Sequence, residues 1–336
     1  MNDSVHDVVV VGAGAAGLTA TLVLGRARRR VMVVNAGEPR NAPAAHTQGF
    51  LPQDGMPLGD LLTVGRAEVA RYGVEMIKER VEDISYGFFV RLAGGAVLKA
   101  HRVLVATGLR DEVLAISGVR ERWGRNVLHC PYCHIRKFRD QAIGVVGNPY
   151  GTPGFSVHQA LLLTQWSDGV VFSPHTLELT EQEREQITAL GIRIEEGEAE
   201  RLGVDSDRLR GAQLGGDRAE PRSAVFVGPC FVPHDALLAS LGCVKSESGW
   251  VTADPTGQTN VFGVWAAGSI TDPRAQVVTA AAVGSASAIA INVSLLEEDT
   301  DRAVETRRAA GPYPTTLEWR KPQVIQAALA NRHHAF

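Results

Sequence analysis

Apolar and polar residues follow one another along the first third of the chain in blocks typical of strand–helix–strand units. Residues 8–11 are four consecutive valines, which predicts a buried strand of a parallel sheet. Further elements are predicted as a helix to about residue 27, a strand at 31–34, a helix at 58–72, a strand at 74–77, short antiparallel strands near 81–84, 88–92 and 97–99, and a buried strand at 102–106.

The same succession returns in the middle of the chain. It predicts a strand at 141–147, a helix at 155–166, a strand at 169–172, a helix at 181–190, a strand at 192–194 and an antiparallel meander out to 227. A strand at 261–266 and a helix at 279–291 follow, and Gly284 with its neighbouring small residues allows that helix close approach to a ligand or another backbone. From residue 297 the chain turns polar, and we expect a C-terminal arm with a short helix at 323–330.

Composition agrees with a globular protein of two domains. The 336 residues are 45% hydrophobic and 21% charged, and the net charge of −3 gives no general attraction to nucleic acid or membranes. Residues 8–25 are apolar, but they lack a basic leader and are broken by glycines, so we expect neither a signal peptide nor a membrane span. The basic cluster at 26–30 is expected to complement a helix C-terminus. These features predict a cytoplasmic protein.

A dinucleotide-binding motif follows the first strand. Gly12, Gly14 and Gly17, with Ala13, Ala15 and Ala16 between them, form G-x-G-x-x-G between a predicted strand and a predicted helix. Such glycines permit a tight turn and let the backbone approach a pyrophosphate. The second strand ends at Asn35 and Ala36 instead of the expected acid, with Glu38 three residues beyond Asn35. An amide can still bond a ribose hydroxyl, so the dinucleotide site remains the prediction.

A long loop at 36–57, rich in glycine and proline, separates this unit from the next helix. Long loops inside compact domains are usually functional.

The most reactive pattern is the segment His129-Cys130-Pro131-Tyr132-Cys133-His134. Proline suits the first turn of a helix, whose positive N-terminus favours a thiolate, and imidazoles beside the cysteines can move protons. A redox-active pair is favoured over half of a zinc site or two inert cysteines. Zinc would need two further ligands, and the only other cysteines, Cys230 and Cys243, do not form a second C-x-x-C.

The second would-be nucleotide turn departs from the pattern for a pyridine nucleotide. Residues 144–151 read Gly-Val-Val-Gly-Asn-Pro-Tyr-Gly, and Pro149 and Pro153 remove backbone donors that a phosphate would need. After the next strand, residues 173–176 contain no arginine for a 2′-phosphate.

With these motifs in view, the chain resembles the thioredoxin-reductase-like flavoproteins over residues 5–295. The resemblance rests on the glycine motif, the turn Ala106-Thr107-Gly108, the C-x-x-C segment, and Gly263-Val264-Trp265-Ala266-Ala267-Gly268. It implies two Rossmann-like, three-layer ββα domains and a homodimer. The implied domains are a discontinuous FAD-binding domain (1–114 and 244–298), a second domain (115–243) that carries the cysteines and a degenerate NADPH site, and an arm (299–336).

The resemblance also implies roles for single residues. Gly12, Gly14 and Gly17 would lie against the pyrophosphate of FAD, and Gln276 and Val277 near the flavin pyrimidine ring. Cys133 would face the flavin and Cys130 would exchange with substrate, with His134 or His129 as acid and base. The remaining cofactor-binding residues that we expect are Ala15, Ala16, Asn35, Ala36, Thr107, Gly108, Gly268 and Ser269.

Three departures separate this chain from ordinary thioredoxin reductases: Ser269 in place of an aspartate, His134 in place of an acid, and the degraded second turn. The last two are similar to the dithiol oxidases of the holomycin and gliotoxin type. We therefore expect an FAD-dependent enzyme that closes a disulfide in a small-molecule dithiol of natural-product biosynthesis, with O2 as acceptor and H2O2 as product. The alternatives are an NAD(P)H- or ferredoxin-dependent reductase of thioredoxin or another disulfide protein, and a non-catalytic redox-sensing or flavin-binding partner protein, which the intact cysteine pair disfavours.

Overall fold

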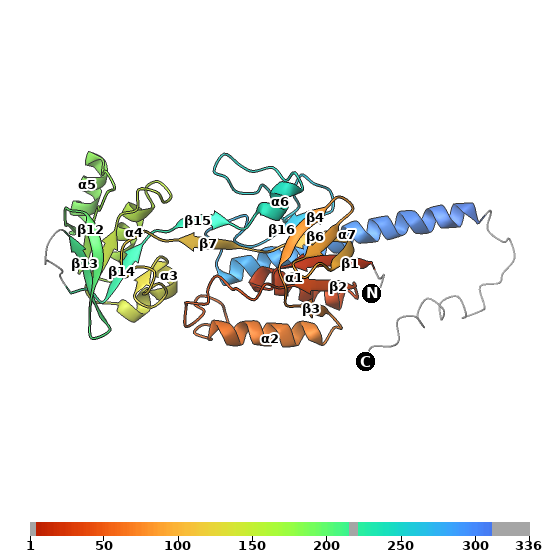
Figure 1. The fold of residues 1–336 in the computed structure, drawn as a ribbon, viewed down its shortest axis with the longest axis horizontal. Helices are drawn as coiled ribbons and strands as arrows, with labels where there is room; N and C mark the ends of the chain where they lie inside the picture. The colour runs from red at the N-terminus through yellow and green to blue at the C-terminus, as the bar shows by residue number, and fades with distance from the viewer. Residues whose placement is uncertain (1–4, 215–220, 311–336) are drawn as a thin grey trace.

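The structure, a computed structural model, describes residues 5–214 and 221–310. Two α/β domains lie one after the other along the long axis, joined by a narrow two-stranded link (Figure 1). The link consists of β7 (Leu109–Glu112) and β15 (Cys230–Pro233). The first domain consists of β1 (His6–Val11), α1 (Ala15–Arg26), β2 (Val31–Val34), α2 (Leu58–Ala70), β3 (Glu75–Ile77), β4 (Val81–Ser85), β5 (Phe89–Leu92), β6 (Val97–Val105), α6 (Ala236–Ser240), β16 (Val264–Ala266) and α7 (Val277–Ala309). The second consists of β8 (Val127–Leu128), α3 (Pro131–His134), a 3-10 turn (Ile135–Phe138), β9 (Ile143–Val146), α4 (Phe155–Leu163), β10 (Val170–Ser173), α5 (Glu181–Ala189), β11 (Arg193–Ile194), β12 (Ala199–Asp205), β13 (Arg208–Leu214) and β14 (Ala224–Val227).

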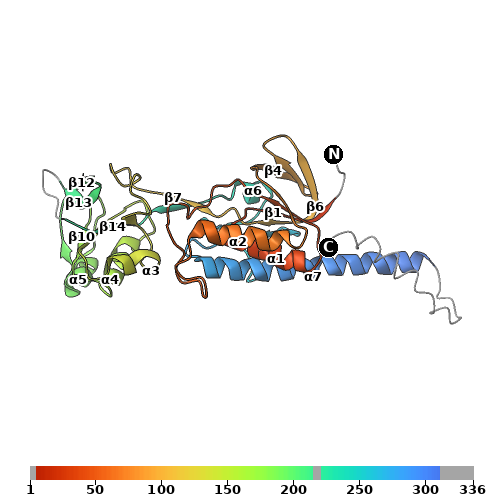
Figure 2. The same ribbon diagram turned by 90° about the horizontal axis from the view of Figure 1, so that it is seen from below.

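The first domain is built on a sheet of order β3-β2-β1-β6-β5-β4, with β16 beside β6. The valines of β1 alternate between its two faces: Val8 and Val10 pack under the helices, whereas Val9 and Val11 pack toward β4 and β5. Helices α1, α2 and α7 lie on one side of the sheet, as Figure 2 shows. A four-valine strand is stable here because both of its faces are buried.

Helix α7 crosses α1 at Gly284, where a Cβ atom would overlap the backbone of Ala16. The small residues of this helix therefore allow contact with another backbone, one of the two alternatives expected from the sequence. By length and composition alone, α7 is long and apolar enough to cross a bilayer, the one such helix among the described residues. Its last turns project beyond the rest of the domain (Figures 1 and 2).

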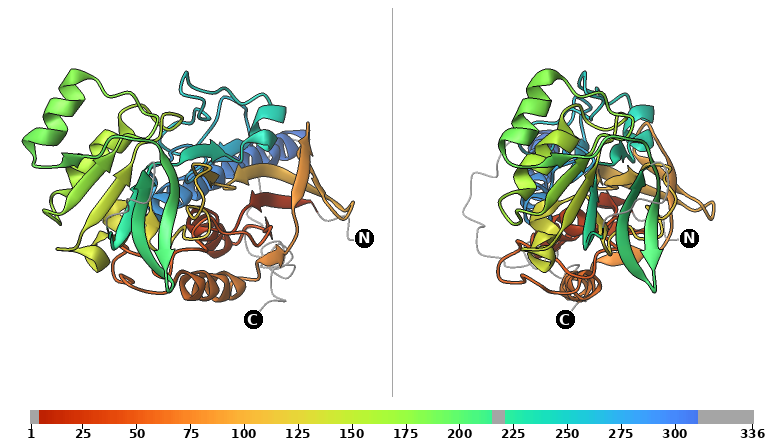
Figure 3. Two further views of the ribbon diagram at one scale, coloured as in Figure 1. Left: turned by 60° about the vertical axis from the view of Figure 1, so that its left-hand side comes forward. Right: turned by 90° about the vertical axis from the view of Figure 1, so that its left-hand side faces the viewer.

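The second domain has a five-stranded parallel sheet of order β11-β10-β9-β14-β8. Helices α4 and α5 lie on one face of it, and the β12–β13 hairpin covers the other (Figure 3). The predicted fold, two Rossmann-like domains of the three-layer type, is confirmed.

Four details differ from the sequence-based prediction. The strand expected at the end of an antiparallel meander, β14, pairs parallel with β8 and β9. Strand β6 is a single strand, because its first residues pair antiparallel with β5 and its later residues pair parallel with β1. The return to the first domain comes before residue 244, since Leu238 of α6 and Cys243 pack in the first-domain core. Helix α7 continues to Ala309, so the boundary expected at residue 299 lies inside a helix. The predicted helix at 323–330 lies outside the described residues.

Candidate functional site

A cavity of about 370 Å³ lies in the first domain, over the carboxyl ends of β1, β2 and β6. It is the position at which open α/β sheets bind nucleotides. Of the cofactor-binding residues expected from the sequence, those that line it are Gly12, Gly14, Ala15, Ala16, Asn35, Ala36, Thr107, Gly108, Gly268, Ser269, Gln276 and Val277.

Gly17 takes a different position. A Cβ atom there would overlap the carbonyl oxygen of Gly12, so its lack of a side chain lets α1 pack onto the turn. At Gly14 a Cβ atom would meet nothing within 4 Å, and it would enter the cavity instead. Gly17, in the first turn of α1, therefore has a packing role and is not among the residues that line the cavity. Its contact with a pyrophosphate stays a prediction.

The cavity fits the diphosphate of a dinucleotide. Gly14 is the N-cap of α1, and no side chain caps the first-turn amides. Amides at a helix N-terminus bind anions through hydrogen bonds and the helix dipole. Gly12, with φ of +106°, adopts a backbone conformation that side chains rarely allow, and a Cβ atom there would overlap the backbone of Ala106. The amide of Gly12 itself donates to the carbonyl oxygen of Val34, so the amides left to bind a phosphate are those at the N-terminus of α1.

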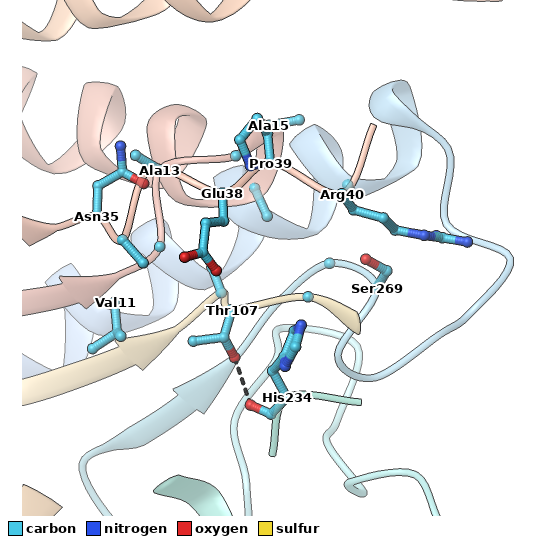
Figure 4. Close-up of a pocket in the computed structure, with 18 of the residues that line it drawn as sticks. Val11, Ala13, Ala15, Asn35, Glu38, Pro39, Arg40, Thr107, His234 and Ser269 are labelled. Carbon is cyan, nitrogen blue, oxygen red and sulfur yellow. Dashed lines mark hydrogen bonds between the residues drawn. The ribbon is translucent and has the colours of Figure 1, made fainter. Parts of the chain in front are cut away.

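An acid that binds ribose was expected at the end of β2, where the chain has Asn35. Glu38 lines the same cavity near that position. Figure 4 shows Asn35 and Glu38 on one side of the cavity and Arg40 extending toward the other, past Ser269. The amide oxygen of Asn35 accepts a hydrogen bond from the backbone of Gly37 at 3.1 Å. Glu38 is paired with Arg80 at 2.9 Å. A carboxylate therefore lines this side of the cavity although the strand itself ends in an amide.

A second, larger cavity of about 1310 Å³ lies between the domains and holds the cysteine motif. It shares Arg40, Gln276 and Val277 with the first cavity, so the two spaces adjoin. The long loop at 36–57, predicted to be functional, contributes residues to both. Aromatic side chains line the second cavity, among them Tyr132, Tyr150, Phe155, Phe231 and Trp250.

The two cysteines of the motif line this cavity as free thiols, and their pKa values are shifted in opposite directions. Cys130 is the N-cap of α3, with Pro131 at its first position, as predicted. A hydrogen bond from the Cys133 thiol lowers the pKa of Cys130, against the opposing effect of burial, and nearby backbone amides and the Arg40 cation add to the lowering. The same bond, together with burial, raises the pKa of Cys133. Because the thiolate is the nucleophile in exchange, Cys130 is the more reactive of the two.

The two flanking histidines differ in their surroundings. The ring of His129 is stacked on Trp123, with centroids 5.6 Å apart, and meets Phe231 edge-on. Burial lowers the pKa of His129 to about 4, so this ring is neutral at physiological pH. His134 has its Nδ1 3.4 Å from the carbonyl oxygen of Cys130, and burial lowers its pKa as well. Its Nε2 is buried and has no hydrogen-bond partner among the described residues.

This geometry favours His134 over His129 as proton acceptor. When Nδ1 of His134 donates to the carbonyl of Cys130, its Nε2 keeps a free lone pair on a ring that lines the same cavity as the two cysteines. His129 is held between aromatic rings by the fold of the second domain.

The second turn of the nucleotide-binding type uses its amides internally. The amide of Asn148 donates to Ser156 Oγ at 3.1 Å, and that of Tyr150 donates to the side-chain oxygen of Asn148 at 3.0 Å. Gly151 donates to the carbonyl of Asn148 at 3.4 Å, while Pro149 has no N–H group. A Cβ atom at Gly147 would overlap the carbonyl oxygen of Pro174, so the following strand end closes over the turn.

Four functional candidates emerge only from the structure: Arg40, Asp111, Trp123 and Phe231. All four line the second cavity, yet they come from the long loop, both strands of the link and the segment before β8. Of these only Arg40 had a signal in the sequence, its place in a loop predicted to be functional. Cys230 also lines this cavity and donates to the carbonyl of Tyr150, whereas Cys243 is buried in the first-domain core beside Thr259.

Comparison with known proteins gives relatives along nearly the whole chain. The crystal structure of HlmI is 51% identical in sequence, with a TM-score of 0.89 over 92% of this chain and 98% of that one. An oxidoreductase from Agrobacterium tumefaciens is 32% identical, with a TM-score of 0.81 over 87% of this chain and 99% of the other. A thioredoxin reductase of Listeria innocua serovar 6a is 27% identical over 323 residues, covering 91% of this chain and 98% of its own.

The model of one protein family matches residues 6–284, which include the glycine turn, the cysteine pair and both domains. A C-x-x-C pair beside a cavity that fits a dinucleotide, in two domains of this type, agrees with that match. The chain therefore belongs to the pyridine nucleotide-disulphide oxidoreductase family.

Proposed function

We propose that this protein is an FAD-dependent dithiol oxidase that closes an intramolecular disulfide in a small-molecule dithiol. In the overall reaction the substrate loses two electrons and two protons, and O2 takes them up to become H2O2. FAD, held against the glycine turn, supplies the two-electron carrier between them.

The observation that carries this proposal is that the backbone amides of the second turn already donate hydrogen bonds within the protein. A pyridine nucleotide needs free amides at such a turn for its pyrophosphate. Here the amides of Asn148, Tyr150 and Gly151 already have acceptors, and Pro149 has no amide to offer. Residues 150–153 instead line the cavity that holds the cysteines. Electrons would then enter from a dithiol instead of NADPH.

The residues around the cavity support a route for those electrons. In the oxidised enzyme, a substrate thiolate would attack Cys130 of the Cys130–Cys133 disulfide, forming a mixed disulfide and releasing the Cys133 thiolate. The second substrate thiol would then attack the mixed disulfide, which closes the substrate disulfide and releases Cys130, whose lowered pKa makes it a good leaving group. By the family resemblance, Cys133 would face the flavin and pass to it the two electrons of the resulting dithiol. His134 would take up the thiol proton at Nε2. Trp123, Phe155 and Phe231 offer flat apolar surfaces suited to a small molecule that contains rings.

A second candidate, a reductase of thioredoxin or another disulfide protein, is favoured by the identity of several relatives. The Listeria innocua protein is named a thioredoxin reductase and covers nearly the same length. In that case the electrons would run in the opposite direction, from NAD(P)H or ferredoxin to a protein disulfide.

Two measurements on the flavin-loaded protein separate these functions. Under anaerobic conditions, NADPH should leave the flavin absorbance unchanged, whereas a small-molecule dithiol should bleach it. In an oxygen electrode without nicotinamide, the dithiol should drive oxygen uptake with one H2O2 formed per disulfide. Rapid bleaching by NADPH, at the rate of turnover, would overturn the oxidase proposal and favour the reductase.

A further inference from the structure

The long loop that lines both cavities also joins the two domains at two points. At the first point, Arg40 forms two hydrogen bonds with Asp111, from Nε to Oδ2 at 3.1 Å and from Nη2 to Oδ1 at 2.7 Å. The guanidinium also lies 5.3 Å from the ring centroid of Phe231, within the range of a cation–π contact. Asp111 and Phe231 are directly paired across β7 and β15. One side chain therefore holds both strands of the link at the same level.

This ion pair is well shielded. The side chain of Arg40 is 16% exposed and that of Asp111 is 8% exposed. A planar guanidinium that grips a carboxylate through two parallel bonds fixes orientation as well as distance. An exposed single-bond pair would do neither, so this contact constrains how the link leaves the first domain.

At the second point, Pro43 packs on Gly124 of the second domain. A Cβ atom at Gly124 would lie 2.6 Å from the Cβ atom and 2.7 Å from the carbonyl oxygen of Pro43, and its φ of +78° is itself suited to glycine. Gly124 follows Trp123, whose ring is stacked on His129, the residue before Cys130. The loop therefore contacts the segment whose Trp123 ring packs on His129, directly before Cys130.

We propose that residues 39–43 form a latch that holds the second domain with Cys130 and Cys133 facing the cavity beside Gln276 and Val277, and that Arg40 is a positioning residue for the dithiol. Two antiparallel strands alone make a flexible connection, and domains joined in this way move relative to one another unless an interface prevents it. The latch supplies that interface. This inference rests on the proposed function, because a flavin that receives electrons only from the cysteine pair benefits from one fixed orientation.

The charge of Arg40 gives the latch a second effect. It lowers the pKa of Cys130 and opposes the rise at Cys133. The other titratable and charged groups of the cavity around the dithiol come from the long loop, β7, α3 and the segment before it, α4, β15 and the surrounding loops: His46, Asp111, His129, Tyr132, His134, Tyr150, His158, Cys230, Asp254, Asp272 and Arg274. Loss of Arg40 therefore changes both domain orientation and thiol acidity, while a change at Gly124 alters orientation alone.

The test compares Gly124→Ala with Gly191→Ala, in the flavin-loaded protein. Both glycines have positive φ, and Gly191 has no atom within 4 Å of its would-be Cβ, so the control carries the backbone strain without the collision. Anaerobic dithiothreitol is the probe: it closes its own ring disulfide as it opens the one between Cys130 and Cys133, and two electrons and two protons pass from the resulting dithiol to the flavin. We expect Gly124→Ala to slow this flavin reduction at least tenfold, with FAD retained, and Gly191→Ala to leave it unchanged.

Arg40 is tested by two further variants and a second readout. Alkylation of the reduced thiols by iodoacetamide, followed against pH, should shift to higher pH in Arg40→Ala. Arg40→Lys, which keeps the charge but not the two-bond grip, should restore the pH profile and leave flavin reduction slow. Gly124→Ala should keep the wild-type alkylation profile.

Wild-type rates of flavin reduction in both Gly124→Ala and Arg40→Ala would overturn the latch. An alkylation pH profile that does not move in Arg40→Ala would overturn the effect of this charge on the dithiol, and a wild-type rate of flavin reduction in Arg40→Lys would overturn the positioning role. The probe acts on the cysteine pair whichever physiological donor or acceptor is correct. Reduction of the wild-type flavin by NADPH would therefore count against the proposed function alone. The rates measured with dithiothreitol would still test the latch.

Discussion

The backbone of Gly17 lies against the carbonyl oxygen of Gly12, with no space for a side chain between them. Gly14, between these two residues in sequence, has open space where its side chain would be, facing the first cavity. The same short motif thus contains one glycine whose side chain would disturb the packing of α1 and one whose side chain would enter the cavity.

Two single glycine-to-alanine substitutions, each of which adds one methyl group, can measure this difference. Gly17→Ala should lower the free energy of unfolding of the apoprotein by about 1–3 kcal/mol, because overpacking forces α1 away from the turn. Gly14→Ala should change apoprotein stability by less than about 1 kcal/mol, as expected at an N-cap, yet weaken FAD binding. Thermal unfolding of the apoprotein and FAD titration give the two quantities. Equal effects of the two variants on FAD affinity at unchanged stability would contradict this assignment.

A second prediction concerns which cysteine lies beside the flavin. A thiolate next to oxidised FAD produces long-wavelength absorbance, so Cys130→Ser, which leaves Cys133, should show this band. Cys133→Ser should lack it. Absorbance spectra of the two oxidised variants decide the matter, and the reverse pattern would exchange the roles of the cysteines.

A third prediction follows from the acidities of the pair. The Cys133 thiol donates to Cys130 and lowers the pKa of Cys130, so the Cys130 thiolate exists at lower pH than for an ordinary cysteine. Cys133→Ala removes the donor, and the alkylation rate of Cys130 at neutral pH should fall. Cys133→Ser, whose hydroxyl can still donate, is the matched control. A profile that is the same in both variants would show that the hydrogen bond does not set the acidity.

His134 is the proton acceptor in the proposed reaction. Replacing it with alanine should slow flavin reduction by a dithiol by about 10²- to 10⁴-fold with FAD retained, the usual contribution of a general base. His129→Ala serves as the comparison, because it removes a ring packed between Trp123 and Phe231 and should chiefly lower stability. Single-turnover rates measure the effect. Retention of the wild-type rate in His134→Ala would remove this residue from the mechanism.

The homodimer implied by the family resemblance stays a prediction, and α7 is where we would test it. Only 22% of its most apolar stretch is buried within one chain, and Ile289, Val293 and Leu296, on successive turns, are 57%, 47% and 57% exposed. Light scattering should give twice the mass of the chain. Ile289→Glu should reduce that mass, while Gln186→Glu on the exposed side of α5 should not. A monomeric wild-type protein would contradict the prediction.

The sequence alone determined the two Rossmann-like domains, the glycine turn and the reactive cysteine pair. These are local patterns: the valines of β1, the spacing of Gly12, Gly14 and Gly17, and Pro131 at the start of a helix depend on residues that are close neighbours along the chain. The degraded second turn was also visible, since a proline removes an amide in any context.

Tertiary structure decided what distant segments do together. Arg40 meets Asp111 and Phe231, and Pro43 meets Gly124, because the long loop crosses from one domain to the other, and no periodicity encodes that crossing. The same applies to acidity: the Cys133 thiol and the amides of the first turn of α3 lower the pKa of Cys130, whereas the same thiol bond and burial raise the pKa of Cys133. The two histidines beside the cysteines also differ only in the folded protein: His129 packs between aromatic rings, whereas His134 keeps an unpartnered Nε2.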